Sequence, residues 1–170
     1  MLSGIVGILA LAMLPPLILS LFEDGSMAIV FGGMIAILGG TAFLLRMLNF
    51  RPSELTIRDG FFITALSWIA LAVLGSIPFV LGGHIPSWTD AFFETMSGFT
   101  TTGASILRDI EKLPDSLLLW RSTTHWLGGM GVIALAVAIF PLMGASGYQL
   151  FRAEVPGPST EKLTPRIRTT

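Results

Sequence analysis

The chain has 170 residues, of which 52% are hydrophobic and only 12% are charged, and its formal net charge is -1 at pH 7. A soluble domain carries about 25% charged residues, so this composition excludes an ordinary soluble protein. The near-neutral balance without a basic cluster excludes nucleic-acid binding. Because the sequence has no cysteine, disulfides, thiolate metal sites and cysteine nucleophiles are excluded as well.

Four long stretches contain no Asp, Glu, Lys or Arg: residues 1–22, 26–45, 60–89 and 122–151. A helix of about 20 apolar residues crosses a bilayer, and each stretch is long enough. We therefore predict an all-α polytopic membrane protein. The first helix, Leu2–Phe22, is expected to kink at Pro15-Pro16. The lack of a basic residue before Arg46 argues against a cleaved signal peptide, while a signal-anchor role stays open.

The order of these stretches predicts two preamble helices followed by one longer unit. The predicted segments are a preamble at 1–50, a cytoplasmic linker at 51–59, a longer unit at 60–151 with bilayer-crossing helices at 60–83 and 117–143, and a cytoplasmic tail at 152–170.

Inside the longer unit, residues 87–98 predict a short helix that opens on Ser87 as a cap, with Asp90 in its first turn. A dozen residues extend for about 18 Å, which cannot cross a hydrocarbon core of about 30 Å. Such a half-crossing helix ends within the membrane, where we expect its last carbonyls to be unpaired and its dipole to be negative.

The segment 99–105 follows this short helix and is predicted to be an extended, buried strand that returns to the surface. Non-helical backbone at membrane depth must be buried in protein or line water. Thr100, Thr101 and Thr102 offer carbonyl and hydroxyl oxygens, and Gly103 can take a positive φ at little cost. Rings of such oxygens replace the hydration shell of an alkali cation. The alternative is an extracellular loop beside a lipid-facing aromatic helix.

Basic residues predict the orientation, because they concentrate in cytoplasmic loops. A cytoplasmic N-terminus and tail place seven basic residues inside and three outside, the latter being Arg108, Lys112 and Arg121. The outer side then has seven acidic residues and a balance of -4. Acidic groups around the entrance of an ion pathway raise the local concentration of cations. An ordinary hydrated loop would have the same composition, so the charge balance alone fits both interpretations.

The stretch Asp90–Ser105 resembles the first pore repeat of the Trk-type, TrkH-like potassium uptake proteins of the Trk/Ktr/HKT superfamily. Similar resemblance lies in His125–Gly131, in the following Val132–Pro141, and in Gln149–Pro158. With the two preamble helices, the resemblance covers essentially the whole chain.

This resemblance implies potassium transport through a pore lined by four helix–pore helix–filter–helix repeats of one chain, in the cell inner membrane. The filter strand would be Thr100, Thr101, Thr102, Gly103, Ala104 and Ser105, with Gly103 as its central glycine and the carbonyls of Thr101 and Thr102 as potassium ligands. The resemblance also implies a homodimer and a TrkA-like cytoplasmic nucleotide-binding regulatory subunit. Potassium is then the only cofactor, and the protein is no enzyme.

Only one such repeat is present, so we expect a fragment of a longer protein that does not conduct alone, unless four copies assemble. A non-conducting scaffold or assembly subunit is an alternative function. Another is an intramembrane hydrolase that uses Ser97 and His125, although a G-x-S-x-G motif is absent from the sequence.

Four residues are predicted to support the filter: Asp90, Glu94, Arg121 and His125. A charge within a membrane span is a functional candidate by default, and in that role Arg121 would pair with Asp90 or Glu94. The sequence alone favours the other interpretation, in which Arg121 snorkels to interfacial water. For His125, we expect a hydrogen bond between helices in preference to metal binding.

Overall fold

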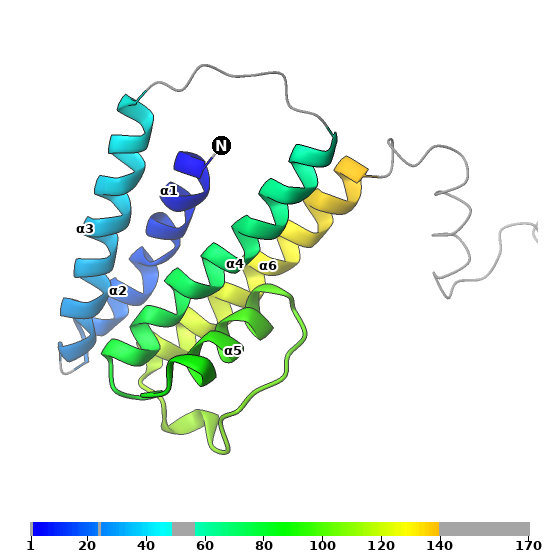
Figure 1. Cartoon of the computed structure of the whole chain (residues 1–170). Coiled ribbons are helices and arrows are strands. Elements are labelled where there is room, and N and C mark those ends of the chain that lie inside the picture. The colour runs from blue at the N-terminus through cyan, green and yellow to red at the C-terminus, as the bar shows by residue number, and fades with distance from the viewer. Residues whose placement is uncertain (1, 24, 49–56, 140–170) are drawn as a thin grey trace, which may run out of the picture. The chain divides into compact units, whose positions relative to one another are not determined.

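The computed structural model describes residues 2–23, 25–48 and 57–139, and every secondary-structure element in these residues is a helix (Figure 1). The predicted all-α class is therefore confirmed. In chain order the elements are α1 (Leu2–Ala12), α2 (Leu14–Ser20), α3 (Ser26–Met47), α4 (Ile57–Leu81), α5 (Trp88–Phe99), the 3-10 helix η1 (Ile110–Lys112) and α6 (Asp115–Ile139).

The described residues divide into two compact units, the first ending at Val132 and the second beginning at Ile133. The predicted tail at 152–170, most of the predicted linker at 51–59 and the last four residues of the predicted helix at 117–143 lie outside the described residues.

The first predicted helix is divided into α1 and α2 at Met13, which is fully buried. Pro15 and Pro16 lie in the first turn of α2, where a missing backbone N–H breaks no helical hydrogen bond. The helical assignment is therefore interrupted for one residue just before the prolines, while hydrogen bonds from Met13 N–H to Leu9 O and from Leu17 N–H to Met13 O continue across the break.

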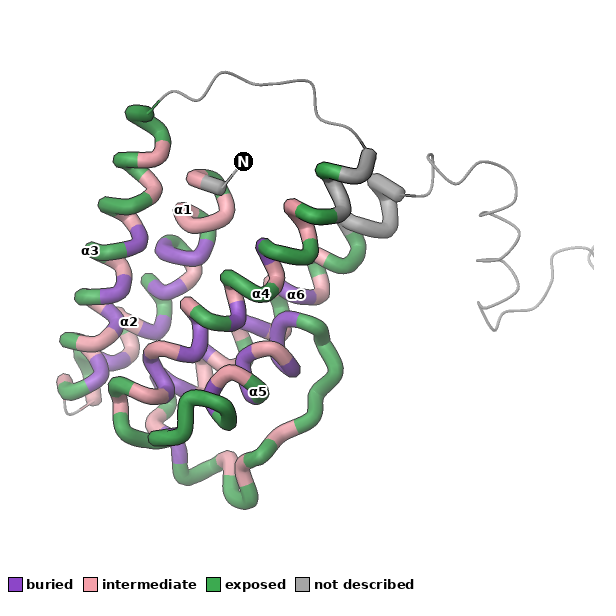
Figure 2. Tube along the Cα trace, in the orientation of Figure 1, coloured by how far each residue is buried: buried purple, intermediate pink, exposed green. Residues whose placement is uncertain are grey.

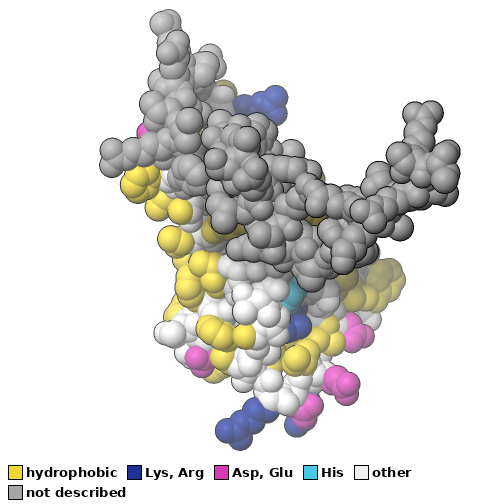
Figure 3. Space-filling view, turned by 90° about the vertical axis from the view of Figure 1, so that its right-hand side faces the viewer, with side chains coloured by type: hydrophobic (Ala, Val, Ile, Leu, Met, Phe, Trp, Pro, Cys, Tyr) yellow, Lys and Arg dark blue, Asp and Glu magenta, His cyan; other side chains and the backbone are white. Residues whose placement is uncertain are grey.

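Three helical segments of the described residues are long and apolar enough to cross a membrane: Ser3–Ser20, Ser26–Met47 and Phe62–Leu81. Many of their outward side chains are large and apolar, among them Ile8, Ile29, Phe43, Phe62 and Leu66. Figure 3 shows hydrophobic side chains spread over the visible face, with most of the acidic and basic groups in its lower part. Unlike these three, α6 begins with a polar half that carries Arg121 to His125.

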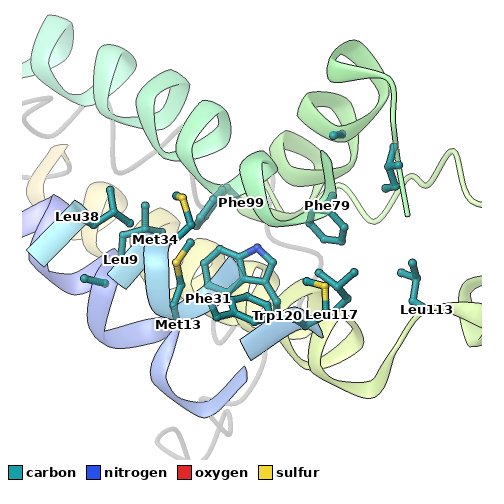
Figure 4. Close-up of a cluster of buried hydrophobic side chains, with 14 residues drawn as sticks. Leu9, Met13, Phe31, Met34, Leu38, Phe79, Phe99, Leu113, Leu117 and Trp120 are labelled. Carbon is teal, nitrogen blue, oxygen red and sulfur yellow. The ribbon is translucent and has the colours of Figure 1, made fainter. Parts of the chain in front are cut away.

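The core of the first unit lies where α1, α3, α4, α5 and α6 meet (Figure 2). Trp120 of α6 is its largest fully buried side chain. Its ring meets Phe31 of α3 edge to face at 6.4 Å, and its indole N–H donates to the carbonyl of Gly75 in α4 at 2.9 Å. Figure 4 shows Trp120, Phe31 and Met13 grouped together. One tryptophan therefore joins three helices, with its polar atom satisfied.

The connection from α4 to α5 is short because two glycines follow Leu81 directly. Gly83 takes a φ of +73°, a left-handed conformation that glycine adopts without steric cost. The chain turns back there, so α5 packs against α4 (Figure 1).

Candidate ion-binding site

The short helix α5 begins as its sequence predicts. Ser87 is the N-cap, and its hydroxyl accepts the backbone N–H of Asp90 at 3.4 Å. Asp90 lies in the first turn, where a carboxylate is favoured by the helix dipole. The 12 residues of α5 make it too short to cross a bilayer.

The end of α5 differs from the prediction, which started the extended strand at residue 99. Phe99 is the last helical residue, and the Thr100 N–H still donates to Met96 O at 2.9 Å. Phe99 is fully buried, and its ring meets Trp68 of α4 edge to face at 6.5 Å. Because this packing fixes the side chain against α4, the helix continues for one residue more than the sequence pattern indicated.

A Schellman cap closes α5. The Thr101 N–H donates to Gly98 O at 2.9 Å, and the Thr102 N–H donates to Ser97 O at 3.0 Å. The expectation that the last carbonyls of this helix are unpaired is therefore wrong for Ser97 and Gly98. The cap satisfies them and reverses the chain direction.

The cap needs a left-handed residue, and the chain places a threonine there. Thr101 has a φ of +57° and is the only non-glycine residue with positive φ in the described part of the chain. This conformation costs an L-residue about 1–2 kcal/mol and is especially unusual for a β-branched side chain. Gly103 follows with a φ of +75°. Strained backbone of this kind is found preferentially at functional sites.

The carbonyl oxygens of Thr101, Thr102 and Gly103 accept no hydrogen bond from any described residue. These residues are exposed on the unit, which differs from the predicted buried strand. By contrast, Thr100 O accepts the Thr101 hydroxyl at 2.7 Å. The hydroxyls of Thr100 and Thr102 lie 2.8 Å apart. The segment thus presents three successive free carbonyls, held by side-chain contacts along one edge.

Contacts with two residues of α5, Ser97 and Glu94, tie the far end of this segment back to that helix. The Ser97 hydroxyl donates to Ala104 O at 2.6 Å. The Ser105 hydroxyl lies 3.0 Å from both carboxylate oxygens of Glu94, and the Ile106 N–H donates to Glu94 Oε2 at 3.1 Å. The segment is therefore fixed at both ends, while its middle carbonyls stay free.

Glu94 also pairs with Arg121 of α6, whose Nε donates to Glu94 Oε1 at 2.6 Å. The Glu94 side chain is 0% exposed and the Arg121 side chain 17% exposed. A carboxylate buried to this extent requires a charged partner and full hydrogen bonding, and Glu94 has both. Asp90 is exposed, and among the described residues Arg121 pairs with Glu94 alone of the two predicted acids.

His125 differs from the prediction of a bond between helices. Its Nδ1 lies 2.9 Å from Arg121 O, one turn back in the same helix. Since a carbonyl can only accept, this contact is a hydrogen bond in the tautomer that carries the proton on Nδ1. Within the described part of the chain, no hydrogen bond joins His125 to Ser97, whose hydroxyl is engaged with Ala104. This geometry lacks the nucleophile–base contact that the hydrolase alternative needs.

Two glycines let α5 and α6 approach closely. A Cβ on Gly128 of α6 would fall on the carbonyl group of Phe99, and a Cβ on Gly98 of α5 would fall on the hydroxyl of Thr124. The backbones therefore touch where α5 ends, which is the use of small residues expected in membrane helix packing.

The sequence reasoning missed the role of Ser97 as a tie to the returning segment. Its partner, Ala104, is seven residues away and in irregular backbone, so no helical or strand period relates the two positions. The only available signal was a hydroxyl at the end of a helix that precedes a glycine-containing segment.

A family model described as TrkH, cation transport protein, matches residues 25–170. The chain belongs to the TrkH family. The TrkH protein of Halomonas elongata, named as a Trk system potassium uptake protein, is 44% identical over 177 residues, which cover 100% of this chain and 37% of that protein. The Vibrio parahaemolyticus protein of the same name is 50% identical over 119 residues, covering 69% of this chain and 24% of that protein.

The crystal structure of the potassium transporter TrkH from Vibrio parahaemolyticus is similar to this chain, with a TM-score of 0.75 at 33% identity. The alignment covers 89% of this chain and 35% of that one. This TrkH family chain is thus a multi-pass membrane protein, and it spans roughly a third of the length of these relatives.

Proposed function

We propose that the chain forms the first pore repeat of a Trk-type potassium uptake protein, in which residues 100–105 form a filter strand whose free backbone carbonyls replace the hydration shell of potassium. The observation that carries this proposal is the row of unpaired carbonyls at Thr101, Thr102 and Gly103. Carbonyl oxygens of this kind are the ligands that potassium filters use. The relatives named above are potassium uptake proteins, which supports the same ion.

The charge environment supports a cation at these carbonyls. The C-terminal end of α5 points its negative dipole end toward the segment. The one buried carboxylate nearby, Glu94, is already neutralised by Arg121. A monovalent ion at this site would therefore meet the partial charges of carbonyl groups rather than the full charge of a carboxylate. Its binding would stay weak enough for the ion to leave rapidly, as permeation requires.

In this proposal the chain supplies one of four filter strands and does not conduct alone. The complete protein would carry further repeats, form a homodimer and bind a TrkA-like regulatory subunit. The chain spans roughly a third of its relatives, which is compatible with one repeat and the preamble. Permeation involves no covalent step, so the proposal assigns no enzymatic reaction.

The proposed location is the cell inner membrane, with the N-terminus and the tail in the cytoplasm. The distribution of Lys and Arg favours this orientation. The α5 helix would then descend from the outer side, and the free carbonyls would lie at its inner end, facing the pore axis.

A chimera tests the proposal. The segment of Halomonas elongata TrkH that matches this chain is replaced by residues 1–170, and potassium uptake is measured in a bacterial strain without uptake systems of its own. The chimera should take up potassium, whereas the 170-residue chain alone should not. A chimera that inserts at the level of its parent but carries no potassium would refute the proposal.

A further inference from the structure

The helix α6 lacks a capping side chain of its own. Its first residue is Asp115, and the preceding Pro114 has no side-chain acceptor. The N–H groups of Leu117 and Leu118 both donate to Pro114 O, at 2.9 and 3.0 Å. The N–H of Ser116 needs another partner, because the first turn of a helix contains no carbonyl for it.

Glu23 supplies that partner from the turn between α2 and α3, 93 residues away in the sequence. Its Oε1 accepts the Ser116 N–H at 2.8 Å, and its Oε2 accepts the Ser116 hydroxyl at 2.7 Å. Ser116 is fully buried. A carboxylate at the positive end of a helix is electrostatically favoured, so this two-point contact anchors α6 to the preamble helices.

A second contact keeps the first turns of α6 in register. Trp120 lies one helical turn beyond Ser116 and is held by the Phe31 ring and by the Gly75 carbonyl. Translation or rotation of α6 at this end would break the contacts of Ser116 and Trp120 together.

The residue after Trp120 is Arg121, which holds Glu94. Glu94 in turn accepts the hydroxyl of Ser105 and the N–H of Ile106, where the exposed segment ends. A continuous series of hydrogen bonds and one rigid stretch of helix thus leads from the preamble to that segment.

We propose that Glu23 is a positioning residue for the segment 100–106, acting through the N-terminal turns of α6 and the Arg121–Glu94 pair. The preamble helices then have a task beyond membrane anchoring, since their outer turn fixes the end of the carbonyl-bearing segment. The inference rests on the proposed function only where it links the position of the segment to potassium transport. The effect of Glu23 on the position of the segment is measured without any ion flux.

The sequence offers a direct test because it contains no cysteine. Ile106→Cys places a thiol at a site that is 39% exposed, and its rate of reaction with a membrane-impermeant maleimide reports the local geometry in the full chain. Glu23→Ala should raise this rate by about 3- to 10-fold, which lies within the range of couplings carried by residues that touch neither end point.

Glu23→Gln is the conservative variant. Its amide oxygen can accept the Ser116 N–H while its amide nitrogen donates to the Ser116 hydroxyl, so the labelling rate should stay near that of the parent. Glu111→Ala removes another acid, an exposed one in η1, and should leave the rate unchanged, which separates positioning from a general loss of outer negative charge.

A second cysteine reporter distinguishes release of the segment 100–106 from a general loosening of the fold. The Lys112 side chain is highly exposed, so the labelling rate of Lys112→Cys should not respond to Glu23→Ala. The inference is overturned if Glu23→Ala changes the Ile106→Cys rate by less than about twofold, or if it accelerates both reporters equally.

If Glu23→Ala does not reach the membrane, Ser116→Ala takes its place, because it removes only the hydroxyl contact. That variant should accelerate Ile106→Cys labelling by about twofold, and an unchanged rate would overturn the inference. A chimera without potassium uptake would refute the proposed function and leave these labelling results standing.

Discussion

Arg121 and Glu94 form an ion pair with an Nε–Oε1 distance of 2.6 Å, and the carboxylate of this pair is completely buried. Two further donors, the Ser105 hydroxyl and the Ile106 N–H, reach the same carboxylate. The pair therefore joins α5, α6 and the end of the segment that carries the free carbonyls.

Arg121→Ala should destabilise the protein by about 3 kcal/mol, because it leaves the buried Glu94 charge without its counterion. Thermal unfolding in detergent, followed by circular dichroism, measures the change. Adding Glu94→Gln to this variant should recover part of the loss, since the amide is neutral. Lys112→Ala is the control: its pair with Asp109 is 80% and 54% exposed and should contribute almost nothing. Equal melting temperatures for the two single variants would contradict the structural role of the buried pair.

Gly128→Ala should cost about 3 kcal/mol, because a small-to-large change at a close contact forces the backbones apart. The new Cβ would overlap the Phe99 carbonyl. Gly129→Ala is the matched control, since its Cβ would meet only Thr101 Cγ2 at an ordinary 3.9 Å, and alanine favours helix by about 1 kcal/mol. In the same unfolding assay, the melting temperature of Gly128→Ala should lie well below that of Gly129→Ala. The reverse order of the two melting temperatures would refute the close crossing of α5 and α6.

Thr101→Gly should stabilise the fold by about 1 kcal/mol, because glycine adopts the left-handed conformation without the strain that threonine meets there. Thr102→Gly serves as the comparison, since Thr102 does not have a positive φ, and it should lose about 0.5–1 kcal/mol through the entropy of glycine. If both variants lose stability to the same extent, Thr101 is not strained as described.

The sequence alone predicted the helical class, the short α5 with its Ser87 cap, and the family. These features depend on local signals: charge-free stretches of bilayer length, a capping serine and a continuous motif. They are encoded within windows of about 20 residues, so no tertiary information is needed to infer them.

The contacts between distant residues could not be predicted in the same way. The chain could have paired Arg121 with Asp90 or Glu94, and only the packing of α5 against α6 selects Glu94. No local pattern relates Glu23 to Ser116, 93 residues away, and the fold brings the two together. The helical state of Phe99 depends on burial of its side chain, which a one-dimensional pattern does not contain.

The central claim, that the carbonyls of residues 100–105 select potassium, is tested most directly by the ratio of potassium to sodium uptake in the chimera carrying Gly103→Ala or Gly83→Ala. Both glycines have a positive φ, +75° and +73°, and open space around them, so alanine meets the same strain of about 1–2 kcal/mol at either site. Gly103→Ala should lower the ratio by roughly tenfold, the factor that corresponds to this energy, whereas Gly83→Ala should leave it unchanged. An unaltered ratio in Gly103→Ala, in a chimera that still transports potassium, would contradict the account.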